Sequence, residues 1–269
     1  MKKKIVFLFS IIVFSFILSC VSSGKTSTNL LENNPEMRTG VLGNGLSYYI
    51  LHNKYPENRI YLRLVIKIGS IVEANNERGL AHFVEHLAFN GSENFTENEL
   101  ISYFESIGMG FGPEINAYTS FDETIYMLEI PADNQEALAK SLTVISDWAN
   151  GLTFDPVEIE KERGVVLEEW RLYRGVGGRA FDALMPFLFP FSRYANRMPI
   201  GRPEVIQNAP RERIVNFYNK WYRPELMSLV IVGDMDSVSV ERMIIERLSS
   251  LPKSSEDQDA LNIMSGQEI

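Results

Sequence analysis

The stretch "GLAHFVEHLAFNGS", residues 79–92, brings two of the chain's three histidines and a glutamate into a largely apolar run. On a helix, His82 and His86 lie one turn apart on the same face, and their ring nitrogens can bind one tetrahedral zinc ion. Glu85 lies at the edge of that face. Zinc lowers the pKa of a water molecule toward about 7, and a neighbouring carboxylate can take its proton. We therefore expect zinc ligands at His82 and His86 and a general base at Glu85.

The alternative interpretation is a buried helix whose histidines are satisfied within the core. That helix would bury two histidines and a glutamate on one face, among residues such as Leu80 and Phe83, and unpaired burial of such groups is costly. The order His-x-x-Glu-His is also the inverted form of a motif common in zinc peptidases. Both observations favour zinc. His52 follows a predicted strand with no partner nearby in the sequence, and we expect it at the surface.

The composition excludes one class of partner. At 269 residues with 45% hydrophobic residues, the chain can bury the core of one large α+β domain. Acidic residues outnumber basic ones by 35 to 26, which gives a net charge of -9, and no basic cluster in the body of the chain is interleaved with aromatic residues. We therefore do not expect a nucleic-acid partner.

The first residues are typical of a targeting signal, because three lysines at 2–4 precede an uncharged run that ends in "ILSC". The pattern resembles a bacterial lipoprotein signal, with residues 1–19 removed and Cys20 lipidated. Leu18 is bulkier than the residue most often found at its position, so a plain signal peptide or an uncleaved anchor stays open. Residues 20–36 read as a flexible tether. The resemblance implies an exported protein of the bacterial cell envelope, lipid-anchored at the periplasmic face or the outer membrane.

Turn and cap signals divide the following residues, 37–252, into the elements of one domain. A hairpin turn is expected at Asn44–Gly45. Capping boxes predict helices that begin at Thr96, paired with Glu99, and at Asp133, paired with Glu136. The remaining expected elements are strands at 59–73, 123–131 and 226–235, helices at 155–173, 211–222 and 238–251, an irregular mobile connection at 175–207, and a polar tail at 253–269.

A catalytic zinc needs a third protein ligand and an open fourth position, and the helix expected at 155–173 offers several acids. Glu162 and Glu169 are seven residues apart and share a face, whereas Glu168 is rotated by about 100 degrees from Glu169. Solvated acids that pair with nearby basic residues are the alternative for several of them. Periodicity alone does not choose the ligand among the candidates Glu158, Glu160, Glu162, Glu168 and Glu169.

At this point the sequence resembles the insulinase and pitrilysin family of inverted-motif zinc peptidases. Besides "HFVEH", the resemblance rests on "GPEINAYTSFDETIYMLEIP", "ERGVVLEEW", "MPIGRPEVIQN" and "WYRPELMSLVIVGDMD". It implies that Glu169 is the third zinc ligand and that Glu162 orients the ligands from behind. It also implies an α+β fold in which a mostly antiparallel sheet carries helices on one face. Asn116 and Ala117 would lie on an edge strand to which an extended peptide adds.

The resemblance implies a zinc metalloendopeptidase that acts on peptides or small unfolded proteins. Peptidases of the family generally have a second, related half that closes over the first. This chain matches only the first half, so we expect a second homologous half, in cis or in trans, as a partner. A binding or scaffolding homologue without catalysis is the alternative, but such members usually lose the His-x-x-Glu-His residues that this chain keeps.

Overall fold

The computed structural model describes residues 34–253. The expected signal peptide (1–19), the expected lipid anchor at Cys20, most of the tether (20–36) and the tail beyond Lys253 lie outside these residues. Within residues 34–253, no helix is both long and apolar enough to span a bilayer.

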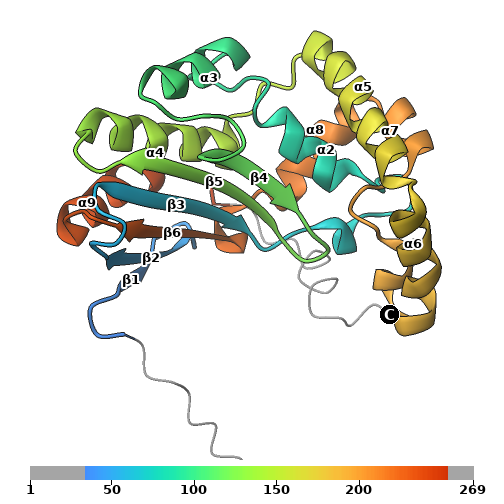
Figure 1. Cartoon of the computed structure of the whole chain (residues 1–269), viewed down its shortest axis with the longest axis horizontal. Helices are drawn as coiled ribbons and strands as arrows, with labels where there is room; N and C mark the ends of the chain where they lie inside the picture. Colours follow the sequence, from blue (N-terminus) through green and yellow to red (C-terminus); the bar gives the residue numbers. More distant parts are fainter. Residues whose placement is uncertain (1–33, 254–269) are drawn as a thin grey trace, which may run out of the picture. The chain divides into compact units, whose positions relative to one another are not determined.

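Six strands form one sheet in the order β1-β2-β6-β3-β5-β4. All neighbours pair antiparallel except β2 and β6, which are parallel. This order leaves β4 at one edge of the sheet and β1 at the other (Figure 1). The strands are β1 (Arg38–Val41), β2 (Ser47–His52), β3 (Arg59–Ile66), β4 (Ile115–Thr119), β5 (Thr124–Pro131) and β6 (Met227–Gly233).

The helices cover one face of this sheet. Along β3, buried and partly exposed residues alternate, because successive side chains point to opposite faces. Figure 1 shows α2, α3 and α4 on the same side of the sheet. The helices are α2 (Leu80–Leu87), α3 (Glu97–Ser106), α4 (Gln135–Asn150), α5 (Pro156–Tyr173), α6 (Val176–Leu188), α7 (Pro203–Asn208), α8 (Arg211–Trp221) and α9 (Ser237–Leu248), with 3-10 turns η1 (Ser70–Val72), η2 (Arg193–Asn196) and η3 (Pro224–Leu226). The expected fold class is confirmed.

Most local signals of the sequence have the expected effect. Gly45 has a φ of 96° in the turn between β1 and β2. Thr96 and Glu99 form the capping box of α3, and the Asp155 side chain accepts from the first backbone N–H groups of α5. The start of α4 was predicted wrongly, because the N-cap is Asn134, whose side chain accepts a hydrogen bond from Ala137. The strand expected at 59–73 ends at Ile66 and is followed by η1.

The expectation of an irregular connection over residues 175–207 is wrong. This segment contains α6, η2 and α7. One reason is Gly178: a Cβ at this position would lie 1.9 Å from the carbonyl oxygen of Tyr173, so only glycine lets α6 pack this closely on the end of α5. Pro203 occupies the first turn of α7, where a proline is tolerated. Glycines and prolines here shape helices instead of interrupting them.

Candidate metal centre

Helix α2 presents its polar residues to α5. It is about two turns long, and its apolar residues Leu80, Phe83 and Val84 are completely buried in the core. The other side of α2 carries His82 and His86, each with 15% of its side chain exposed. Packing of the apolar side therefore directs both imidazole rings toward α5, with which α2 is in contact.

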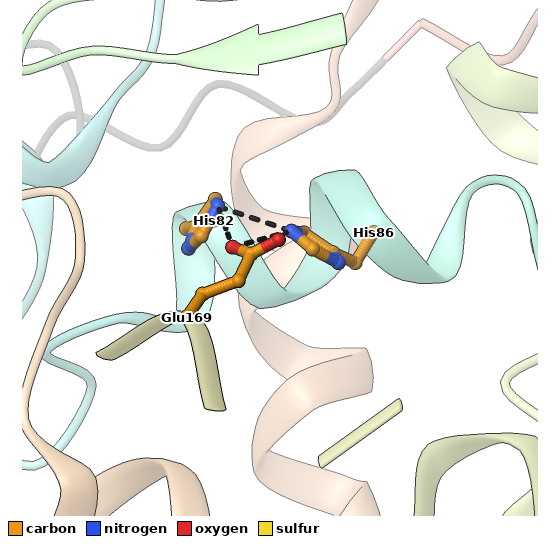
Figure 2. A group of neighbouring side chains, drawn as sticks. All are labelled: His82, His86 and Glu169. Atoms are coloured by element: carbon orange, nitrogen blue, oxygen red, sulfur yellow. Dashed lines mark hydrogen bonds and ion pairs between the residues drawn. The ribbon is translucent and has the colours of Figure 1, made fainter. Parts of the chain in front are cut away.

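Glu169 reaches from α5 to both histidines (Figure 2). The two Nε2 atoms are 3.1 Å apart, and Glu169 Oε2 is 3.5 Å from His82 Nε2 and 3.4 Å from His86 Nε2. Ligands that bind one tetrahedral zinc at 2.0 to 2.2 Å are separated by about 3.3 to 3.6 Å. The three separations are close to these values. Two imidazole nitrogens and a carboxylate oxygen are also a donor set that zinc accepts, so the residues fit the metal.

The two histidines differ in what their second ring nitrogen contacts. His86 Nδ1 is 2.7 Å from Glu162 Oε1, and Asn90 Nδ2 donates to Glu162 Oε2 at 3.0 Å. Burial raises the pKa of Glu162, but these bonds outweigh burial and leave that pKa below its ordinary value. An ionised Glu162 keeps the proton of His86 on Nδ1 and leaves Nε2 free to bind a metal. His82 Nδ1, in contrast, is buried and has no hydrogen-bond partner among the described residues.

Glu85 lies beside the cluster of His82, His86 and Glu169 but is not one of its three metal donors. Its Oε2 is 3.8 Å from His82 Nε2 and accepts a hydrogen bond from the Thr119 hydroxyl at 3.3 Å. Burial raises the pKa of Glu85 to about 7. A carboxylate with a pKa near neutrality that lies next to the place of a reacting water can serve as a general base.

The other candidate acids of α5 form ion pairs away from the cluster. Glu168 is 2.8 Å from Arg171, with 57% of its side chain exposed. Glu158 pairs with Lys161, and Glu160 pairs with Arg163. The alternative interpretation of solvated, paired acids therefore describes Glu160 and Glu168, whereas Glu158 is paired but has only 19% of its side chain exposed. His52 is exposed, as expected, with Nδ1 3.0 Å from the Met235 carbonyl oxygen.

The edge strand β4 runs beside α2. Backbone groups alternate in direction along an antiparallel strand, and the hydrogen bonds at both ends of β4 place the N–H and C=O groups of Ala117 and Thr119 on the open edge. Asn116 Oδ1 accepts from the Ala117 N–H at 2.8 Å, and its Nδ2 donates to the Gly112 carbonyl at 3.1 Å. Asn116 and Ala117 thus lie on an edge strand, as the sequence led us to expect.

A cleft of about 810 Å³ is lined by His82, His86, Glu169 and Glu85, by residues 116–119 of β4 and by residues 198–200. Sequence reasoning missed the contacts of Thr119 and Asn90. A signal for Asn90 existed, because it follows His86 by four residues and so lies one turn further along the chain. No spacing rule points to Thr119, because its contact with Glu85 joins a strand to a helix. Residues 198–200 were assigned to a mobile connection, yet they line the cleft.

Two family models match the chain. The model described as insulinase (peptidase family M16) matches residues 48–174, and the model described as peptidase M16 inactive domain matches residues 208–266. The probable zinc protease PqqL of Haemophilus influenzae is 41% identical over 92% of this chain and 26% of that protein. The probable zinc protease PqqL of Escherichia coli is 38% identical over 88% of this chain and 26% of that protein. The chain spans about a quarter of the length of these relatives.

Solved structures agree with this match. The first half of the periplasmic protease PqqL from Escherichia coli has a TM-score of 0.80 and 38% identity, over 83% of this chain and 48% of that chain. Pitrilysin has a TM-score of 0.71 over 84% of this chain and 24% of that chain, and at 21% identity the likeness concerns the fold alone. The resemblance that the sequence motifs indicated is confirmed.

Proposed function

Because the chain belongs to the insulinase family of peptidases, family M16, we propose that it is a zinc metalloendopeptidase that hydrolyses extended peptides. The observation that carries this proposal is the convergence of His82, His86 and Glu169 from two helices, with Glu85 next to them. A binding or scaffolding protein would not need a near-neutral carboxylate beside a zinc-type donor set. The full set therefore favours catalysis over scaffolding.

In this proposal His82, His86 and Glu169 hold the metal and Glu162 fixes the orientation of His86. These residues would hold a zinc ion that, when bound, would supply polarisation of the scissile carbonyl and a water molecule of lowered pKa. Glu85 accepts the proton of the attacking water, which its raised pKa makes possible near neutral pH. The same carboxyl group can then give a proton to the leaving amine. Thr119 holds one oxygen of Glu85 while this proton moves.

An extended peptide would add to the open edge of β4. The backbone groups of Thr119 and the carbonyl of Ala117 face that edge and can pair with the main chain of a substrate, which tolerates many sequences. The Ala117 N–H joins them only when Asn116 Oδ1 releases it. Asn116, whose amide already bonds backbone groups of this edge, is placed to bond the peptide backbone. The peptide would then cross the cleft in front of Glu85 and the metal. Peptides or small unfolded proteins are the substrates that such pairing selects.

We also propose that a second homologous half, in cis or in trans, completes the enzyme. The relatives named above are about four times as long as the matched segment, and acyl transfer needs donors for the developing oxyanion as well as a clamp on the substrate. Export to the bacterial cell envelope is proposed on the basis of the signal at residues 1–19 and of the periplasmic relative. Anchoring by a lipid on Cys20 remains part of this proposal.

The decisive experiment measures zinc content together with hydrolysis of a quenched peptide by the zinc-loaded chain in complex with its second half. Glu85→Gln should keep about one zinc per chain and lose about 10² to 10⁴ in turnover, because the base is removed and the ligands stay. Loss of zinc from this variant, with the fold intact by circular dichroism, would show that Glu85 is a ligand. Turnover close to that of the unmodified protein would refute its role as the base.

A further inference from the structure

Glu73, at the end of η1, carries a buried carboxyl group to which the proposed reaction gives no part. Its side chain is fully buried. Oε1 accepts a hydrogen bond from the Ala81 N–H at 2.9 Å, and Oε2 accepts one from the Gly79 N–H at 3.0 Å. Both amides belong to the N-terminus of α2, where the N-cap is Gly79, which has no side chain to cap the helix. Glu73 therefore performs the capping from outside the helix.

The position of this cap is important for His82, because the two histidines differ in what orients their rings. Glu162 orients the ring of His86 through Nδ1, whereas His82 Nδ1 is buried without a partner among residues 34–253. A histidine that binds a metal almost always has such an outer partner, which fixes the direction of the ring. His82 directly follows Ala81, which Glu73 holds. The direction of the His82 ring is thus determined by the position of its backbone, and Glu73 fixes that position.

Glu73 is itself held by hydrogen bonds from the segment that follows α6. Its carbonyl oxygen accepts hydrogen bonds from Arg193 Nη2 at 2.6 Å and from Arg197 Nε at 2.7 Å. Arg193 Nε also donates to the Ile71 carbonyl at 2.6 Å, and the Ser70 hydroxyl donates to the Arg197 carbonyl at 2.5 Å. These contacts join η1 to η2, directly before the residues 198–200 that line the cleft. Glu73 therefore connects the first turn of α2 to the segment that leads into residues 198–200.

We propose that Glu73 is a positioning residue for the metal centre, which fixes the first turn of α2 and thereby the direction of the His82 ring. This inference rests on the zinc site proposed above. A well-formed metal site keeps its ligand distances within about 0.2 Å of their ordinary values. A two-turn helix released at its N-terminus can shift or tilt by more than this. Loss of the cap should therefore weaken the metal site even while the fold persists.

Glu73→Gln is the principal test, because it keeps the size of the side chain and replaces one acceptor oxygen by an NH₂ group that faces an N–H donor. Glu73→Asp keeps the carboxyl group but is too short to reach both amides, and it provides a second variant. The matched control is Asn44→Asp, an equally conservative exchange of a buried polar group. Asn44 is 4% exposed and donates to the carbonyls of Leu248 and Leu251. It lies in the β1–β2 turn, at the sheet edge opposite β4.

Zinc affinity is measured by competitive titration with a chelator, at a temperature where each variant is folded by circular dichroism. The absorption spectrum with cobalt(II) in place of zinc reports the ligand geometry. Glu73→Gln should weaken zinc binding about 10 to 100-fold, the range for a lost outer partner of a ligand, and should change the cobalt spectrum. Asn44→Asp should lower the melting temperature and leave zinc affinity and the cobalt spectrum unchanged. If Glu73→Gln does not fold, Glu73→Asp decides by the same two measurements.

Unchanged affinity and an unchanged cobalt spectrum in a folded Glu73 variant would overturn the inference. So would a loss of affinity in Asn44→Asp that matches the loss in the Glu73 variant, because the effect would then follow stability alone. Absence of zinc binding by the unmodified chain would refute the proposed function, and this inference with it. Normal binding by the unmodified chain together with an unaffected Glu73 variant would refute this inference alone.

Discussion

Glu168 and Glu169 are neighbours in the sequence, but their side chains have different surroundings. Glu169 Oε2 lies within 3.5 Å of both histidine Nε2 atoms, whereas Glu168 pairs with Arg171 at an exposed position. Glu169→Ala should therefore weaken zinc binding by at least the roughly 10 to 100-fold that losing an outer partner costs. Glu168→Ala should leave it nearly unchanged, because an exposed ion pair contributes little. If a competitive chelator titration gave the reverse ranking, Glu168 and not Glu169 would be the metal ligand.

At this scale the sequence could predict faces of helices but not contacts between helices. The spacing of His82 and His86 gives one helical face, and the spacing of Glu162 and Glu169 gives another. Which of these two acids reaches the Nε2 atoms of both histidines depends on how α5 packs against α2, and no spacing rule contains that information. The assignment of Glu169 came from the family resemblance. The contact of Thr119 with Glu85 was missed for the same reason, since it joins a strand to a helix.

At the scale of elements, predictions succeeded where one local signal was sufficient. Asp155 and Pro156 mark the start of α5, because the cap and the fixed φ of proline act within a single turn. The prediction for residues 175–207 was wrong because their glycines and prolines were interpreted as signs of irregular structure. Gly178 instead permits the close approach of α6 to Tyr173. Close packing between helices depends on the tertiary structure. The sequence alone does not show whether a glycine interrupts a helix or permits such packing.

Zinc would join α2 to α5, which are otherwise held by packing and by the contact of His86 with Glu162, and removal of the metal should lower stability. A ligand present at about 1,000 times its dissociation constant stabilises the native state by about 4 kcal/mol. For a domain of this size this corresponds to a shift in melting temperature on the order of 10 °C. Calorimetry with and without a chelator measures the shift. Glu169→Ala should show a much smaller one at the same zinc concentration, and an equal shift would mean that zinc stabilises the fold elsewhere.

At the scale of the whole molecule, the question is whether this chain alone can hold and hydrolyse a substrate. The open edge of β4 and the limited match to longer relatives both bear on it. The chain spans about a quarter of the length of the PqqL proteins, and an extended substrate held on one edge strand is exposed on its other side. We expect the zinc-loaded chain alone to hydrolyse unstructured peptides slowly. Loss of a single oxyanion donor costs on the order of 10² to 10³ in rate, and the clamp would be absent as well.

Addition of the complementary half, from the same gene or from a partner subunit, should restore turnover without a change in zinc content. The two are compared with the same mixture of unstructured peptides and the same zinc loading. Equal rates for the isolated chain and the assembly would show that this chain is a complete enzyme, and that the second half has another purpose.

The most direct test of the central claim is the zinc content of the purified chain, measured by mass spectrometry of the metal after dialysis against metal-free buffer. If His82, His86 and Glu169 form the metal centre, the unmodified chain retains about one zinc ion. The double variant His82→Asn, His86→Asn, folded by circular dichroism, retains almost none. A folded, unmodified chain that retains no zinc after exposure to the metal would contradict the account, and so would a double variant that retains as much zinc as the unmodified chain.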